Sequence, residues 1–117
     1  MPRDYRLYLE DMHEALLRVT RYTAGVSYDA FVKDELRIDA VVRNLEMVGE
    51  AAKHVPQALR KQHPSVAWKQ ISGLRDILIH QYFAVSLPIV WDIVQNEVPN
   101  LVNSLRSMLE ESADEPS

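Results

Sequence analysis

The chain has 117 residues, of which 47% are hydrophobic and 26% charged, and it carries a net charge of −4 at pH 7. This balance is typical of one globular domain and excludes a disordered chain, while the acidic charge disfavours a general nucleic-acid binder. The sequence contains no cysteine, so disulfides and thiolate metal sites are excluded. It also shows no signal-peptide pattern and no apolar run near the ~18 residues of a membrane span, so we expect a cytoplasmic protein without membrane contact.

Residues 4–23 are the first predicted helix, because apolar side chains recur there every three or four positions. The expected buried stripe consists of Tyr5, Leu9, Met12, Leu16, Val19 and Thr23. Asp4 suits the N-cap of this helix and Gly25 suits its end. Ser27 is expected to cap a short helical turn that reaches Phe31. We expect His13 to lie on a solvated face.

Residues 34–55 form the strongest predicted helix. Its expected buried stripe consists of Ile38, Val41, Leu45, Val48, Ala52 and Val55. Gly49 costs about 1 kcal/mol relative to alanine inside a helix, so it indicates a close approach by a neighbouring helix, for which a second copy of the protein is one candidate. Pro56 should end or kink this helix, and residues 58–62 can add one turn.

A third long helix is predicted to begin at Ser65 or Val66 and to continue through the GLRDILIHQYF stretch. Its core stripe consists of Trp68, Ile71, Leu74 and Leu78. The last helix, residues 87–109, follows a cap and first-turn signal formed by Ser86 and Pro88. Its expected buried residues are Ile89 or Val90, Ile93, Val94, Leu101, Leu105 and Met108. Pro99 should bend or split this helix, because proline removes an amide donor and crowds the preceding turn.

No segment alternates with period two, so no strand is expected. The predicted fold is all-α, a bundle of four long helices plus short ones. The predicted domain spans residues 4–109, and residues 110–117 are expected to be a flexible acidic tail.

The stretch 73–83 places three functional polar residues, Arg75, His80 and Tyr82, inside an otherwise apolar run. A buried cation or imidazole costs free energy unless it is paired. On a regular helix, with about 100° per residue, Arg75 and Tyr82 lie on nearly the same face, whereas Arg75 and His80 diverge by roughly 140°. The helix could distort, the long arginine could reach around, or a second subunit could complete a site. We favour a symmetric dimer with two copies of the motif at its two-fold axis.

These residue types suit cleavage of RNA by its own 2′-hydroxyl group. Histidine is the side chain whose unperturbed pKa lies near neutrality, and positioned acid–base groups contribute about 10²–10⁴-fold. Arginine binds phosphate oxygens with two parallel donors, and tyrosine can donate a hydrogen bond or stack on a base. None of this chemistry requires a metal. The alternative is a structural network in which His80 is a hydrogen-bonded core residue and Arg75 pairs with Asp76.

The order Arg75, Asp76, His80 and Tyr82 spells R-x4-H-x-Y with a polar residue directly after the arginine. This signature resembles that of the HEPN-superfamily ribonucleases, and more closely that of the HepT-like toxins. The resemblance extends to RNLEMVGEAAKHVP (43–56), WKQISGLRDILIHQYF (68–83) and VWDIVQNEVPNL (90–101). It therefore covers most of the chain.

The resemblance implies an all-α HEPN domain that forms a homodimer and cleaves RNA without a metal or another cofactor. On the matching positions, Arg75 would engage the scissile phosphate, His80 would act as acid or base, and Asp76 would orient the site. HepT-like toxins are paired with a small MntA-like nucleotidyltransferase antitoxin that transfers AMP onto the motif tyrosine. Tyr82 would therefore be both a site residue and the AMPylation site. The added phosphate would occlude the site and compete for its cation.

An acidic chain must steer RNA to a local basic strip. The candidates are Lys69, Arg60 and Lys61, with Arg43 and Lys53 from the facing helix as further candidates. Two other functions remain open from the sequence. One is a non-catalytic helical subunit that binds the nucleotidyltransferase or a nucleotide, and the other is a plain structural dimer.

Overall fold

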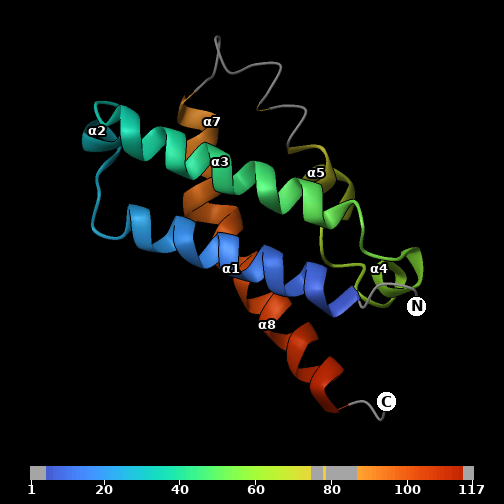
Figure 1. Cartoon of the computed structure of the whole chain (residues 1–117). Helices are drawn as coiled ribbons and strands as arrows, with labels where there is room; N and C mark the ends of the chain where they lie inside the picture. Colours follow the sequence, from blue (N-terminus) through green and yellow to red (C-terminus); the bar gives the residue numbers. More distant parts are fainter. Residues whose placement is uncertain (1–4, 75–77, 79–86, 115–117) are drawn as a thin grey trace.

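The computed structural model describes residues 5–74, 78 and 87–114, and side chains within these ranges up to residue 111. These residues form helices and connecting turns without a strand, which confirms the all-α prediction. Figure 1 shows their arrangement. The helices are α1 (Tyr5–Thr23), α2 (Tyr28–Phe31), α3 (Glu35–Ala52), α4 (Gln57–Gln62), α5 (Trp68–Ser72), α7 (Leu87–Asp92), the π-helical segment η2 (Ile93–Glu97) and α8 (Val98–Asp114).

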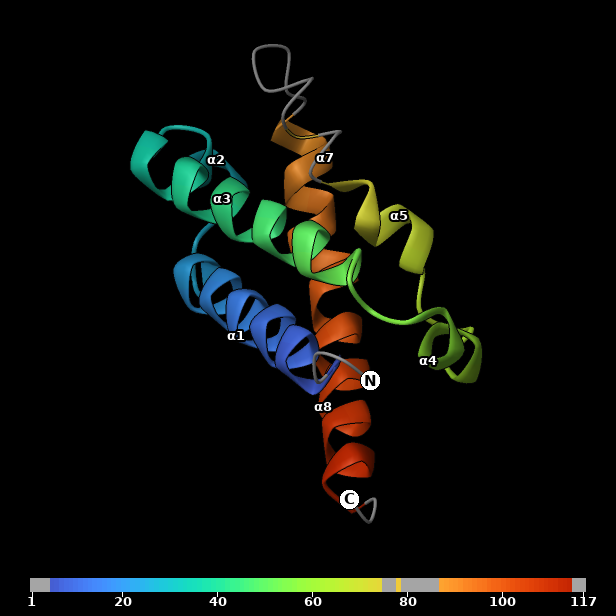
Figure 2. The same cartoon turned by 45° about the vertical axis from the view of Figure 1, so that its right-hand side comes forward.

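The helices α1 and α3 lie side by side and run in opposite directions (Figures 1 and 2). The reversal between them uses the predicted local signals. Gly25 has a φ of 70°, which suits a glycine at a helix end. Ser27 caps α2 by accepting a hydrogen bond from the Ala30 N–H at 3.1 Å. Asp34 caps α3 in the same way through the Arg37 N–H at 3.1 Å.

The elements α7, η2 and α8 follow one another end to end and cross the α1–α3 pair (Figure 2). Pro99 lies in the first turn of α8 and directly follows the π-helical segment. In an α-helix the ring of Pro99 would crowd the Gln95 carbonyl. Instead the Val98 N–H bonds to the carbonyl of Ile93, five residues earlier. The predicted distortion is therefore present as a widened turn, and the chain continues as a helix on both sides.

The core forms where α1, α3 and the C-terminal helices meet. Most members of the predicted stripes are buried, and the fully buried ones include Leu9, Leu16, Val41, Leu45 and Leu105. The predicted members Tyr5, Ile38, Ile93 and Leu101 are only partly buried and pack against this core. On α7, Val90 faces the core of the protein and Ile89 does not, since Val90 is 1% exposed and Ile89 is 53% exposed. Gly49 is buried within this single chain.

The helix ends differ from the predictions at four places. α3 stops at Ala52, because the following N–H groups bond only three residues back, His54 to Ala51 and Val55 to Ala52, and Val55 is nevertheless buried before Pro56. α5 begins at Trp68, later than predicted, because the Val66 N–H bonds to the His63 carbonyl in a turn. α5 also ends at Ser72, because the chain turns at Gly73, so the predicted third long helix is interrupted there. α8 continues to Asp114, into the predicted tail. Glutamates such as those at 110 and 111 are strong helix formers. The predicted caps Asp4 and Ser86 lie outside the described residues.

His13 differs from its prediction as a solvated side chain. It is half-buried, and its Nε2 atom is buried without a hydrogen-bond partner. His13 lies at the edge of the apolar stripe of α1, next to Met12. At such an edge position the helical periodicity does not decide between a buried and a solvated side chain.

Candidate functional site

The four predicted motif residues, Arg75, Asp76, His80 and Tyr82, lie outside the described residues. Their mutual geometry and the shared cleft of a dimer therefore remain predictions. The structure does describe two apolar residues of the same stretch. Leu74 packs against the core and Leu78 is 3% exposed within it, as predicted.

The motif stretch is held between two core-anchored helices. On its N-terminal side, α5 contributes the buried residues Trp68 and Ile71 and contacts α3. On its C-terminal side, α7 contributes the buried residue Val90 and leads into η2, which contacts α1. Because α5, α7 and Leu78 are all fixed by the core, the chain between Gly73 and Leu87 is attached to a packed scaffold at both ends.

Arg60, a predicted RNA-binding residue, makes several contacts within the chain. Its guanidinium group donates to the carbonyls of Ala52 at 2.6 Å and Val55 at 3.2 Å, where α3 ends. It also reaches the Ser72 hydroxyl at 3.4 Å and lies 5.8 Å from the centre of the Trp68 ring. Arg60 thus joins the end of α3 to α5, and these contacts occupy much of its donor capacity.

The other predicted basic residues are exposed. Lys61, Lys69 and Lys53 have exposed side chains. Arg43 is exposed as well and lies 3.9 Å from the Glu46 carboxylate, which is long for an ion pair and contributes little at a surface. A role for Lys61 and Lys69 in RNA binding remains a prediction.

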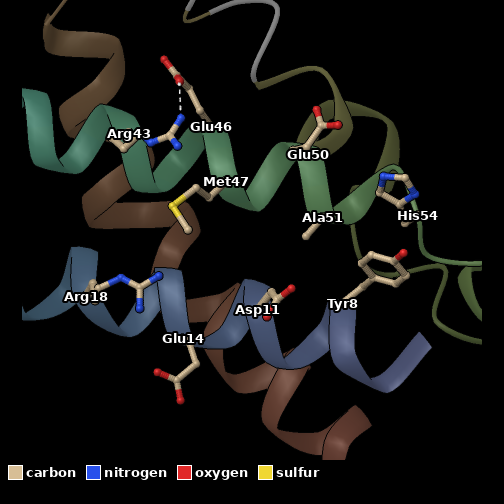
Figure 3. Close-up of a pocket in the computed structure, with 10 residues that line it drawn as sticks. All are labelled: Tyr8, Asp11, Glu14, Arg18, Arg43, Glu46, Met47, Glu50, Ala51 and His54. Carbon is tan, nitrogen blue, oxygen red and sulfur yellow. Dashed lines mark ion pairs between the residues drawn. The ribbon is translucent and has the colours of Figure 1, made fainter. Parts of the chain in front are cut away.

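A groove of about 570 Å³ lies between α1 and α3 (Figure 3). Tyr8 and His54 stack at one end of it, with ring centroids 4.8 Å apart and planes at 15°. Its lining includes four carboxylates and two arginines, namely Asp11, Glu14, Glu46, Glu50, Arg18 and Arg43. Arg18 donates to the buried Asn44 amide oxygen at 2.7 Å, which fixes its side chain against α3. We call this feature the acidic groove, and its excess of carboxylates opposes the binding of a phosphate backbone.

A second depression, of about 470 Å³, lies between α2 and the α7–η2 segment. We call it the aromatic cleft, and its lining consists of Tyr28, Pro88, Trp91, Asp92, Gln95 and Asn96. The Trp91 ring lies 4.9 Å from the buried Phe31 ring and 6.0 Å from the Tyr28 ring. No local sequence pattern indicates this cleft. Its aromatic residues, Tyr28 and Trp91, are far apart in the sequence. From the sequence alone, each is equally compatible with a place in the core.

The charged form of Asp34, at the start of α3, is stabilised by Arg37. The N–H of Arg37 and then its guanidinium group hold the pKa of Asp34 below its usual value of 3.8. Among the described residues, no group of three or more metal-ligating side chains is close enough to hold a metal ion. The described helices also include none that is long and apolar enough to cross a membrane.

Comparison with known proteins connects this scaffold to one family. The family described as "Ribonuclease HepT-like" matches residues 12–108. "Putative RNase MJ0127" of Methanocaldococcus jannaschii is 39% identical over 100% of this chain and 99% of its own length. "Putative RNase TTE0752" of Caldanaerobacter subterraneus subsp. tengcongensis is 39% identical over 90% of this chain and 94% of its own.

"Probable ribonuclease HepT" of Thermococcus cleftensis is 36% identical over 86% of this chain and 92% of its own length. No solved structure matches the chain. The family match includes α3, α5, the whole motif stretch and most of α8. This chain therefore belongs to the HepT-like ribonuclease family of all-α HEPN proteins.

Proposed function

We propose that this protein is a metal-independent endoribonuclease and the toxin component of a toxin–antitoxin module. Its site would be the R-x4-H-x-Y motif at the cleft of a homodimer. Arg75 would bind the scissile phosphate, His80 would act as acid or base, and Asp76 would orient the site. The observation that carries the proposal is the presence of all four motif residues, in order, inside a chain that matches the HepT-like ribonuclease family over residues 12–108.

The chemistry needs three groups that this motif provides. Attack of a 2′-hydroxyl on the adjacent phosphorus breaks the bond to the 5′-oxygen, so one proton leaves the nucleophile and another reaches the leaving oxygen. An imidazole can perform either transfer near neutral pH. A guanidinium group stabilises the charge that accumulates on the phosphate oxygens. The two copies of His80 in a dimer could divide the acid and base roles.

The fold supports this proposal because it anchors the motif stretch. Core-anchored helices flank the motif stretch, and Leu78 fixes its middle in the core. A scaffold of this kind can hold polar groups in position.

Regulation would act on the same site. Transfer of AMP from ATP to the Tyr82 hydroxyl forms a phosphodiester bond at the tyrosine oxygen and releases pyrophosphate. The adduct places a negative charge and a nucleoside beside Arg75, where substrate phosphate would bind. An MntA-like nucleotidyltransferase would catalyse this step and so act as the antitoxin.

Cleavage of RNA by the purified chain in EDTA tests the proposed activity. We expect His80→Ala and Arg75→Ala to reduce the rate by at least ~10²-fold, the lower end of positioned acid–base catalysis. His54→Ala and Arg21→Ala are matched controls, because both residues are exposed and outside the motif. Equal rates for all variants, or no cleavage by the wild-type chain, would contradict the proposal and favour a non-catalytic subunit.

Intact mass tests the proposed regulation separately. The wild-type chain should gain one or more AMP units when it is co-expressed with a cognate nucleotidyltransferase, and Tyr82→Phe should gain none. The modified protein should no longer cleave RNA. Modification at the remaining tyrosines in Tyr82→Phe would show that Tyr82 is not the acceptor.

A further inference from the structure

The aromatic cleft between α2 and the α7–η2 segment differs in charge from the acidic groove. Two aromatic rings and a proline form its apolar part, and two amides and one carboxylate form its polar part. The acidic groove, by contrast, has four carboxylates in its lining. An aromatic face next to a few amide groups suits a flat, polar, uncharged heterocycle.

The geometry of the rings explains how such a ligand would lie. Phe31 is fully buried and packs against Trp91, which fixes the indole and leaves it half-buried. The Tyr28 and Trp91 planes meet at 61°, so the two rings cannot sandwich a planar ligand. A base would instead stack on one ring and meet the edge of the other, which is a favourable arrangement for aromatic groups.

The π-helical segment brings the polar groups to the cleft. Gln95 and Asn96 both belong to η2 and both line the cleft. Asn96 donates to the Asp92 carboxylate at 2.5 Å, which leaves its amide oxygen as an acceptor. The Gln95 side chain is exposed and makes no hydrogen bond within the part of the chain that the structure describes. Amide groups of this kind can read the donor and acceptor pattern of a base edge.

The cleft also lies close to the motif along the sequence. Pro88, which lines the cleft, follows Tyr82 by six residues in the sequence. It belongs to α7, the first described helix after the motif stretch. Figure 1 places α2 and α7 at the same end of α3. The cleft and the motif stretch are therefore joined through α7.

We propose that the aromatic cleft binds one unpaired nucleobase of the RNA, with Trp91 or Tyr28 as the stacking surface and Gln95 and Asn96 as the groups that select the base. This inference rests on the proposed ribonuclease function and adds a specificity site to it. The cleft does no chemistry; it decides which sequence is presented to the motif. One stacked base contributes about tenfold or more in affinity.

Photo-crosslinking to the full chain tests base binding directly. The probes are single-stranded RNA oligonucleotides that carry 4-thiouridine or 6-thioguanosine at successive positions. We expect crosslinks at Tyr28 or in residues 88–96. Crosslinks only elsewhere, or none at all, would overturn the proposal whether or not the protein cleaves RNA. A protein that crosslinks at the cleft but does not cleave would retain the base site and lose the proposed function.

Cleavage of a randomised RNA pool then tests base selection. Gln95→Ala should relax the base preference at one position near the cut. Tyr28→Ala should weaken RNA binding about tenfold. Trp91→Phe keeps an aromatic ring and the packing on Phe31, so it should weaken binding by less than Tyr28→Ala. Gln62→Ala on α4 is the matched control and should change neither. An unchanged preference in Gln95→Ala together with unchanged binding in Tyr28→Ala and Trp91→Phe would contradict the proposal.

Discussion

The α1–α3 pair and the segment from Trp68 to Glu97 differ in almost every structural respect. α1 and α3 are long, regular helices that begin or end at recognisable caps and bury continuous apolar stripes. The second segment contains a five-residue helix, the motif stretch, a short helix and a π-helical turn. The regular pair contributes most of the fully buried side chains. The irregular segment also buries Trp68, Leu78 and Val90, and it carries the predicted motif and most of the aromatic cleft. Stability and chemistry should therefore respond to different substitutions.

The largest expected effect on stability is in the regular pair. Leu16 on α1 is 1% exposed, so Leu16→Ala should lower the free energy of unfolding by about 3 kcal/mol through lost burial and a residual cavity. Leu36→Ala is the control, because Leu36 is 81% exposed and its loss should be close to neutral. Urea denaturation measures both. A similar loss in the two variants would mean that the packing around α1 is not what stabilises this fold.

Arg60→Ala should have the next largest effect, because this residue connects the two regions. It removes the charge-assisted hydrogen bonds to the carbonyls at the end of α3 and the contact with Trp68. We expect a loss of about 2 kcal/mol in the free energy of unfolding. Lys61→Ala, at the adjacent exposed position, should change it by less than about 0.5 kcal/mol. If Arg60 acts only through RNA, the two variants will be equally stable and only RNA binding will fall.

Pro99→Ala should change the irregular segment with a smaller effect on stability. Alanine supplies the missing N–H and removes the ring, so η2 can return to regular α-helical bonding. We expect a gain of about 1 kcal/mol, less than the ~3 kcal/mol cost of proline in a regular helix, because the π turn already avoids the clash. Amide exchange at position 99 of the variant reports the new hydrogen bond. If the amide at position 99 exchanges rapidly while the Val98 amide stays protected, the π turn persists without the proline. The π turn would then have another cause.

The smallest effect concerns the start of α3. Because the pKa of Asp34 is lowered, its charge stabilises the folded protein fully above its ordinary pKa of 3.8, and this contribution is lost as the pH falls through the lower native pKa. Asp34→Asn keeps a capping side chain but removes the charge, so it should be slightly less stable than the wild type at neutral pH and lack this acid-dependent loss. Thermal unfolding between roughly pH 2 and 7 measures the difference. Identical pH profiles would show that the Arg37 contacts do not persist in solution.

The sequence predicted the regular pair better than the irregular segment, for physical reasons. A stripe such as Leu9, Met12 and Leu16 is periodic, and burial follows from the periodicity. The role of Arg60 depends on carbonyls at the end of another helix, and no local pattern encodes that contact. The aromatic cleft escaped detection because Tyr28 and Trp91 meet only through the tertiary fold. The motif was found through its spacing, but its spatial arrangement lies outside the described residues.

One paired measurement tests the separation of stability and chemistry most directly. The initial rate of RNA cleavage per folded molecule and the free energy of unfolding are measured for wild type, Leu16→Ala and His80→Ala. We predict that Leu16→Ala loses stability and keeps its rate, whereas His80→Ala keeps its stability and loses at least ~10²-fold in rate. Cleavage by His80→Ala at the wild-type rate would contradict the account.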